Sequence, residues 1–234
     1  MRFPSPLLEG HLVRRYKRFL ADVELAGGEV VTVHCANPGS MLGLAEPGMR
    51  VLLSRSDRPG RKLPLSWELV EAPGCGLVGI NTALPNRLVE EAIREGRIPE
   101  LAGYDRVRRE VAYGRQSRVD FLLEAEGRSD AFVEVKNVHF SRLARLAEFP
   151  DSVTARGARH LDELAEMVAA GHRAAMVYVV QRTDSATFAI CRDLDPKYAA
   201  AFERARAAGV EMLAYRCRIS AEEISIAEAI TIVG

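Results

Sequence analysis

The sequence predicts an α/β (α+β) protein in which a small N-terminal β-barrel precedes a mixed sheet with flanking helices. Three observations predict this class. The first 80 or so residues consist of short β-type runs divided by turn residues. Beyond residue 82, segments with helical spacing alternate with strands. One hairpin near the middle of the chain collects its charges on a single face. A chain of 234 residues can bury a sizeable core in one large or two small domains.

The N-terminal part is predicted to be a domain spanning residues 1–82. Turn sequences such as NPGS and EPG divide it into strands expected at 11–25 (broken or bent), 29–35, 49–55, 67–72 and 77–81. About five strands in about 80 residues suit an OB-type barrel, and an SH3-like barrel is the alternative.

The C-terminal part is predicted to be a second domain spanning residues 83–234. Its first helix covers 86–96, with Asn86 as the cap and Gly96 as the stop. Further helices are expected at 152–171 and 196–209, and strands at 106–114, 117–125, 130–138, 174–182 and 210–217. This order implies a mixed sheet with helices on its faces.

Composition narrows the function classes. The 32 basic and 32 acidic residues balance, so any affinity for nucleic acid must come from local clusters. The four cysteines form no C-x-x-C pair, which argues against a zinc ribbon and fits a reducing cytoplasm. No apolar run approaches the ~20 residues of a membrane span, so no membrane association is expected. The glycine pairs match no phosphate loop, so no nucleotide cofactor is expected. The sequence makes no prediction of the oligomeric state.

The hairpin formed by 117–124 and 131–138 contains the candidate catalytic residues. With a tight turn centred on Gly127, facing residues have numbers that sum to 254. Asp120 then faces Glu134, and Arg118 faces Lys136. The opposite face of both strands is wholly apolar.

Directly opposed carboxylates destabilise a sheet unless a cation lies between them. A divalent cation is the natural candidate, because one or two carboxylates with water and phosphate oxygens hold Mg²⁺. Lys136 could then hold a metal-bound water or stabilise charge on a phosphate. If the preceding strand pairs across YGRQ, Glu110 would approach Asp120 as well. The alternative is a solvated sheet face whose mixed charges are held by Arg118 and Lys136.

An aspartate in one strand and Glu-x-Lys in the next resemble the core of the PD-(D/E)XK nucleases. The literal proline is absent, because Val119 precedes Asp120. Over nearly the full length, LLEGHLVRRYKRFLADVEL, HCANPGSM, GINTALPNRLVEEAI, YGRQSRVDFLL, AFVEVKNV and FPDSVTARGARHLDELAEM occur in this order. Together they resemble the sugar fermentation stimulation protein A (SfsA) family.

This resemblance implies an OB-like N-terminal domain, a nuclease-like C-terminal domain and DNA as the partner. By the same resemblance, Asp120, Glu134 and the carbonyl of Val135 would hold Mg²⁺ or Mn²⁺. Lys136 would be the catalytic base or electrostatic stabiliser, completing the catalytic set Asp120, Glu134 and Lys136. Glu90 resembles the additional acid of many such nucleases, and its alternative is a solvated helix face.

Basic side chains supply candidate DNA contacts. In RRYKR, strand alternation would turn Arg15 and Lys17 to one side and Arg14, Tyr16 and Arg18 to the other. A basic face with an aromatic suits single strands on OB-type folds, whereas the alternative is a solvated strand with a core tyrosine. The full predicted set is Arg15, Lys17, Arg18, Arg118, Arg156 and His160. The last two share one helix face at i, i+4 and are expected to contact either DNA or the site.

The sequence thus predicts a cytoplasmic, DNA-binding, divalent-metal nuclease. The rival interpretation is a DNA-binding transcriptional regulator of sugar metabolism with a non-catalytic nuclease-like fold. A small-molecule enzyme of sugar metabolism is a third hypothesis, motivated only by the family name.

Overall fold

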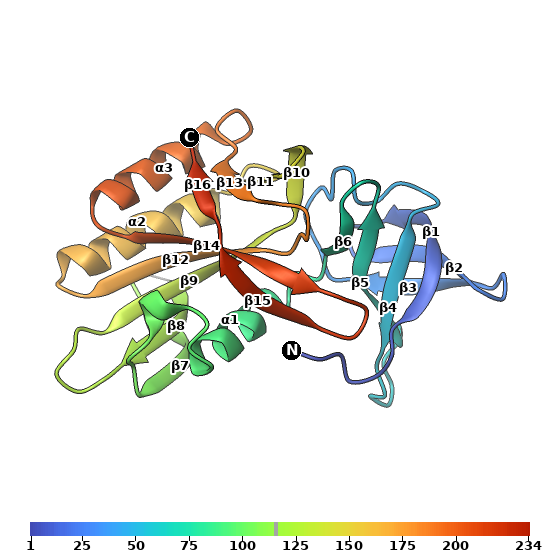
Figure 1. Cartoon of the computed structure of the whole chain (residues 1–234), viewed down its shortest axis with the longest axis horizontal. Coiled ribbons are helices and arrows are strands. Elements are labelled where there is room, and N and C mark those ends of the chain that lie inside the picture. The colour runs from blue at the N-terminus through green and yellow to red at the C-terminus, as the bar shows by residue number, and fades with distance from the viewer. Residues whose placement is uncertain (115–116) are drawn as a thin grey trace.

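A computed structural model describes residues 1–114 and 117–234, and it confirms the predicted fold class. Figure 1 shows a β-barrel beside a larger unit in which helices flank a mixed sheet. The described helices are α1 (Pro85–Arg94), α2 (Ala155–Ala169) and α3 (Pro196–Ala207), with a 3₁₀ turn at Pro99–Leu101. None of these helices combines the length and apolar character needed to cross a membrane.

The barrel is built from β1 (Leu8–Tyr16), β2 (Leu20–Leu25), β3 (Val30–Cys35), β4 (Arg50–Arg55), β5 (Leu65–Ala72) and β6 (Gly76–Gly79). The strand order is β3-β2-β1-β4-β5-β6, and parallel pairing of β3 with β5 closes the first five strands into a barrel. Its core includes Trp67, Leu53 and Val23, all fully buried. The strand predicted at 11–25 splits because Lys17 and Arg18 turn the chain with positive φ angles of 48° and 62°.

The second unit contains a six-stranded sheet in the order β15-β14-β12-β9-β8-β7. Its strands are β7 (Arg106–Tyr113), β8 (Ser117–Glu124), β9 (Ala131–Val138), β12 (Arg173–Val180), β14 (Glu211–Ile219) and β15 (Ile224–Ala229). The central strand β12 runs parallel to both β9 and β14. The α1 side chains pack with Phe121, Val133 and Val177 on one face of the sheet. Side chains of α2 and α3 pack with Leu122, Phe132 and Met176 on the other face.

A smaller sheet was missed in the sequence. It has the order β10-β11-β13-β16, with β10 (Phe140–Leu143), β11 (Leu146–Phe149), β13 (Thr187–Ile190) and β16 (Thr231–Val233). These strands have only three or four residues each, too few for an alternating pattern to stand out. The cap predicted at Asn86 is also wrong, because α1 begins at Pro85 without a side-chain cap. In α2 the hydroxyl of Thr154 accepts the cap hydrogen bond from the amide of Gly157.

The two units contact each other through both backbone and side chains. The amide of Gly79 donates to the carbonyl of Gln181 at 2.9 Å. The amino terminus of Met1 lies 2.7 Å from Glu91 of α1, so the first residues contact the second unit rather than the barrel. The division between residues 82 and 83 stays a prediction.

Candidate active site

The two strands that carry the predicted site match the predicted register and then separate. Phe121 pairs with Val133, Leu122 with Phe132 and Leu123 with Ala131, and the ladder ends there. Asp120 and Glu134 therefore lie just beyond the last pair, where β8 and β9 diverge. The carboxylate of Asp120 occupies the opening, and its Oδ2 accepts a hydrogen bond from the amide of Val135 at 2.7 Å.

Asp120 is fixed from a second direction by α1. Asn86, predicted to cap this helix, instead donates its side-chain amide to Oδ1 of Asp120 at 2.7 Å. Burial, and next the charge of Glu134, raise the pKa of Asp120 above its ordinary value. The two carboxylates thus repel each other in a poorly solvated place, as the sequence predicted for this pair.

Glu134 is 3% exposed, and its two oxygens have different surroundings. Oε1 accepts a hydrogen bond from Nζ of Lys136 at 2.8 Å and another from Nδ1 of His160. Oε2 is buried and has no hydrogen-bond partner among the described residues. Burial opposes ionisation, but the hydrogen bond from His160 and the charge of Lys136 outweigh it and hold the pKa of Glu134 below its ordinary value.

His160 belongs to this site and not to the surface. Its side chain is 2% exposed, so the direct DNA contact predicted for it does not fit its position. Nε2 accepts a hydrogen bond from Nε of Arg156 at 3.2 Å, and Nδ1 faces Glu134. In this arrangement Nδ1 carries the hydrogen that is donated to Glu134. Arg156, which is exposed, is linked through His160 to the buried carboxylate.

Two further polar groups near the site were not singled out in the sequence. The hydroxyl of Tyr113 and Oε2 of Glu163 are buried and have no hydrogen-bond partner in the described chain. Burial, followed by the charges of Glu134, Glu163 and Asp120, raises the pKa of Tyr113. Glu163 lies three positions after His160 on α2. That spacing on one helix face is the signal that could have found it.

Two further acids were predicted near the metal. Glu90 is paired with Arg94 at 2.8 Å and with Arg109 at 3.5 Å. Glu110 is exposed, has a φ of 53°, and forms no ladder pair, although the pairs on either side of it place it opposite Asp120. Its predicted approach to Asp120 stays a prediction. No three His, Cys, Asp or Glu side chains of the described residues form a group suited to a metal ion.

The donors that remain fit a hard divalent cation. Asp120 and Glu134 supply carboxylate oxygens, which such cations prefer. The unpartnered Oε2 of Glu134 is a buried acceptor that lacks a positive or hydrogen-bonding neighbour. Leaving such an atom unsatisfied costs about 1–3 kcal/mol. A cation would satisfy it and would relieve the repulsion that raises the pKa of Asp120.

The predicted DNA contacts on the barrel differ among themselves. Nη2 of Arg15 donates to the carbonyls of Arg18, Asn37 and Gly39 at 3.0, 2.8 and 2.9 Å. Arg15 therefore holds two loops together. Lys17 and Arg18 are exposed in the turn after β1, so the strand alternation predicted for them is wrong.

Arg118 lies beside the site on β8. Its side chain is exposed and donates to the carbonyl of Glu110 at 2.9 Å. It stands two positions before Asp120 on the same strand.

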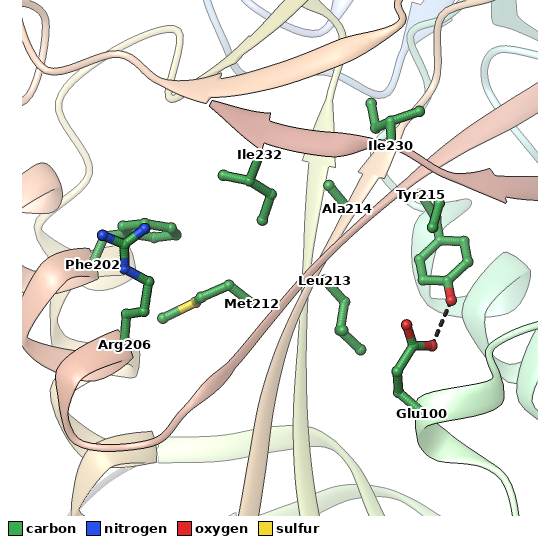
Figure 2. Close-up of a pocket in the computed structure, with 10 residues that line it drawn as sticks. Glu100, Phe202, Arg206, Met212, Leu213, Ala214, Tyr215, Ile230 and Ile232 are labelled. Carbon is green, nitrogen blue, oxygen red and sulfur yellow. Dashed lines mark hydrogen bonds between the residues drawn. The ribbon is translucent and has the colours of Figure 1, made fainter. Parts of the chain in front are cut away.

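A cavity of about 410 Å³ lies away from this site, between α3 and the strands β14 and β16. Figure 2 shows Met212, Leu213 and Ile232 around it. The hydroxyl of Tyr215 donates to Glu100 at 2.5 Å across one end. None of the residues that line this cavity belongs to the predicted site.

Comparisons with known proteins agree with the fold. The family described as SfsA N-terminal OB domain matches residues 13–80, and the family described as sugar fermentation stimulation protein RE domain matches residues 83–223.

The curated relatives include a sugar fermentation stimulation protein homolog of Methylobacterium nodulans. It is 61% identical, over 100% of this chain and 99% of its own. A homolog of Rhodospirillum centenum is also 61% identical, over 97% of each chain. The solved structure of Pyrococcus furiosus SfsA in complex with Ca²⁺ is 28% identical, with a TM-score of 0.88 over 100% of this chain and 98% of that chain. The chain belongs to the SfsA family.

Proposed function

We propose that this protein binds DNA and hydrolyses its phosphodiester bonds at Asp120, Glu134 and Lys136 with a bound divalent cation. One observation carries the proposal. The buried carboxylate of Glu134, the half-buried carboxylate of Asp120 and the ammonium group of Lys136 converge where β8 and β9 separate, and Oε2 of Glu134 has no partner among the described residues. A site with this arrangement on a nuclease-like fold is suited to metal-assisted hydrolysis.

Asp120, Oε2 of Glu134 and the carbonyl of Val135 would hold the cation. Mg²⁺ or Mn²⁺ is the proposed cofactor, supported by the Ca²⁺ that the Pyrococcus furiosus relative binds. When bound, such an ion polarises a phosphoryl oxygen and makes a water molecule more acidic. The hydrogen bonds to Asp120 and Glu134 keep both carboxylates oriented before the ion arrives.

Lys136 would meet the reacting phosphate. Its side chain is 14% exposed and lies 2.8 Å from Oε1 of Glu134. An ammonium group held this way can stabilise the negative charge that grows on the phosphate oxygens. His160 competes for the same oxygen and fixes the carboxylate from the α2 side.

The exposed cations around the site would position the DNA backbone. Arg118 and Arg156 lie on the elements that carry the site, and Lys17 and Arg18 lie in the barrel turn. Contacts of this kind supply sequence-independent affinity that weakens as salt is added. We also propose a cytoplasmic location, because all four cysteines are free thiols.

A cleavage screen tests the proposal. Wild-type protein is incubated with single-stranded, duplex and branched DNA in Mg²⁺ or Mn²⁺, beside Asp120→Ala and the exposed control Lys197→Ala. We expect cleavage by wild type and by Lys197→Ala, and no cleavage but retained DNA binding by Asp120→Ala. Cleavage by Asp120→Ala at the wild-type rate would exclude this site.

One observation favours a second function, that of a DNA-binding regulator without cleavage. Lys136 is bonded to Glu134, so its charge is already balanced inside the protein. Salt-dependent DNA binding together with a complete lack of cleavage in either metal would support this function over the nuclease.

A further inference from the structure

A cleft of about 300 Å³ lies where the barrel meets the nuclease-like unit. One wall comes from the barrel and includes Arg18 and Asn37. The other wall comes from the ends of β9 and β11 and from the segment that leads into α2. At this volume the cleft is at the small end of ligand cavities, with room for a single planar ring system.

Two elements, β9 and α2, contribute residues both to the cleft and to the proposed active site. Asn137, in its wall, directly follows Lys136 on β9. Thr154, also in its wall, caps α2, the helix that carries His160 six residues later, about 9 Å along the helix axis. The cleft and the proposed active site therefore share the end of β9 and the start of α2.

The polar wall of the cleft holds a donor and an acceptor next to each other. His139 is 6% exposed, and its Nδ1 faces the side-chain amide of Asn137 at 2.8 Å. Its hydrogen is therefore on Nε2, a buried atom without a hydrogen-bond partner in the described chain. Oδ2 of Asp151 lies 3.7 Å from this nitrogen, too far for a good hydrogen bond, and it accepts hydrogen bonds from the amide and the hydroxyl of Ser40 at 3.2 and 3.3 Å.

A donor beside an acceptor matches the Watson–Crick edge of a nucleobase. Each of the four DNA bases presents an acceptor next to an N–H donor on that edge. In a duplex this edge is occupied by the partner base, and it becomes available only when the base is unpaired. The chemistry of His139 and Asp151 thus selects an unpaired base.

The remaining walls suit the ring and the phosphate of the same nucleotide. Phe149 and Pro150 give an apolar surface, and the ring of Phe149 is fixed by Tyr198 at 5.1 Å between centroids. The first turn of α2 has no acidic residue, and the carboxylate of Asp195 accepts a hydrogen bond from the N-cap amide of Thr154 at 2.7 Å. The first amides of α2, at Ala155 and Arg156, have no acceptor within the helix, and such amides favour phosphate.

We propose that this cleft binds one unpaired nucleobase, with its phosphate at the start of α2. The inference rests on the proposed function, because the nucleotide belongs to the strand that the active site takes. The same chemistry could bind a free mononucleotide, which the experiment below distinguishes. The proposal gives the protein a preference for single strands, strand ends or flipped bases over an intact duplex.

The test uses single-stranded oligonucleotides with 2-aminopurine at successive positions, bound in Ca²⁺ with strand integrity checked on a gel. Val153 lines the cleft and is 72% exposed, so Val153→Trp should fill the mouth without disturbing the fold. Val30→Trp is the matched control, because Val30 is 55% exposed on the barrel and lies outside the cleft. Unfolding midpoints of both variants confirm that they are folded.

We expect a rise in fluorescence at one position of the strand, and an abasic nucleotide at that position should weaken binding about tenfold. Val153→Trp should abolish the rise and weaken binding to a similar extent, whereas Val30→Trp should match wild type. The inference is overturned if DNA binds but the fluorescence rises at no position of the strand. It is also overturned if Val153→Trp gives the same fluorescence rise and the same affinity as wild type.

Two further outcomes are separable. In the first, the fluorescence of free 2-aminopurine deoxynucleotide responds to wild type but not to Val153→Trp, and no labelled strand responds. This outcome would overturn the inference that the bound nucleotide belongs to a DNA strand. A complete lack of DNA binding would overturn the proposed function itself, at the binding step and before any base is probed.

Discussion

The proposed metal site and the basic turn of the barrel hold their charges in opposite ways. In the site, Glu134 and His160 are 3% and 2% exposed and are bonded to each other. In the turn, Lys17 and Arg18 are exposed on a tight left-handed bend. The Arg18 side chain donates a hydrogen bond of 3.5 Å to the carbonyl of Pro38. The fold therefore surrounds Glu134 and His160 with protein groups, and it leaves the side chains of Lys17 and Arg18 facing solvent.

This difference has an energetic origin. A charge taken out of water must be paired or hydrogen-bonded, so the buried groups have one arrangement only. Exposed cations keep their water, and their attraction to phosphate is weakened by salt. A single substitution in the site should therefore abolish or strongly reduce cleavage or metal binding. A single substitution in the turn should change DNA affinity only a few-fold.

Lys136→Ala should have the largest effect. Loss of the ammonium group is expected to lower the cleavage rate by about 10²–10⁴-fold, the range for one acid–base or electrostatic group. DNA affinity should stay within a few-fold of wild type, because most affinity comes from exposed cations. Single-turnover cleavage and fluorescence anisotropy measure the two quantities, with Lys197→Ala as the control. A variant that cuts as fast as wild type would show that Lys136 is not part of the reaction.

The sequence was informative about this site because the paired parts of its two strands alternate. The apolar face predicted from Phe121, Val133 and Val135 fixed the register, since a slip by one residue would bury the charges in the opposite core. Val119, predicted on the same face, packs instead with Leu122 and Phe132 in the other core. The observed pairs Phe121–Val133 and Leu122–Phe132 follow that register. The barrel was predictable for a similar reason, because turn residues divide its strands clearly.

Other contacts of the site depend on tertiary packing between elements, which a local sequence pattern does not predict. The amide of Val135 reaches Asp120 only because the strands separate at that point. His160 reaches Glu134 only because α2 packs across β9, although its spacing from Arg156 on one helix face was visible in the sequence. Lys17 and Arg18 look like strand residues until the positive φ angles of the turn are known.

His160→Ala should have the next largest effect. Removing the imidazole takes away one of the two groups that orient Glu134, and such supporting groups change metal affinity by about 10–100-fold. Calorimetric titration with Mn²⁺ measures this affinity without any need for cleavage. His160→Gln should restore part of it, and His11→Ala, an exposed histidine on the barrel, should have no effect. Equal Mn²⁺ affinity in wild type and His160→Ala would contradict the positioning role.

Asp120→Asn should stabilise the protein when no metal is bound. Burial and Glu134 raise the folded-state pKa of Asp120, so the folded state binds its proton more tightly than the unfolded state does. This carboxyl therefore lowers stability as pH rises from the unfolded pKa, near 3.9, through the raised folded pKa. The neutral amide avoids that loss, and the amide of Asn86 can rotate to accept from it.

A gain on the order of 1 kcal/mol corresponds to an unfolding midpoint about 2–4 °C higher for a chain of this size. Thermal unfolding at pH 7 in EDTA checks the sign. Added Mn²⁺ should then stabilise wild type and leave Asp120→Asn unchanged. A lower midpoint for the variant in EDTA would mean that the carboxylate of Asp120 stabilises the metal-free protein and that its repulsion by Glu134 is weak.

Lys17→Ala should have the smallest effect, and it tests the turn side of the comparison. If Lys17 contacts one phosphate, its loss should weaken DNA binding a few-fold at moderate salt and reduce the slope of log affinity against log salt by about 0.9. Arg15→Ala is the informative partner variant, because Arg15 holds the carbonyls of Asn37 and Gly39. It should lower the unfolding midpoint, whereas Lys17→Ala should not. Lys17→Ala with an unchanged salt slope would remove this turn from the DNA surface, and the arginines beside the metal site would then carry the phosphate contacts.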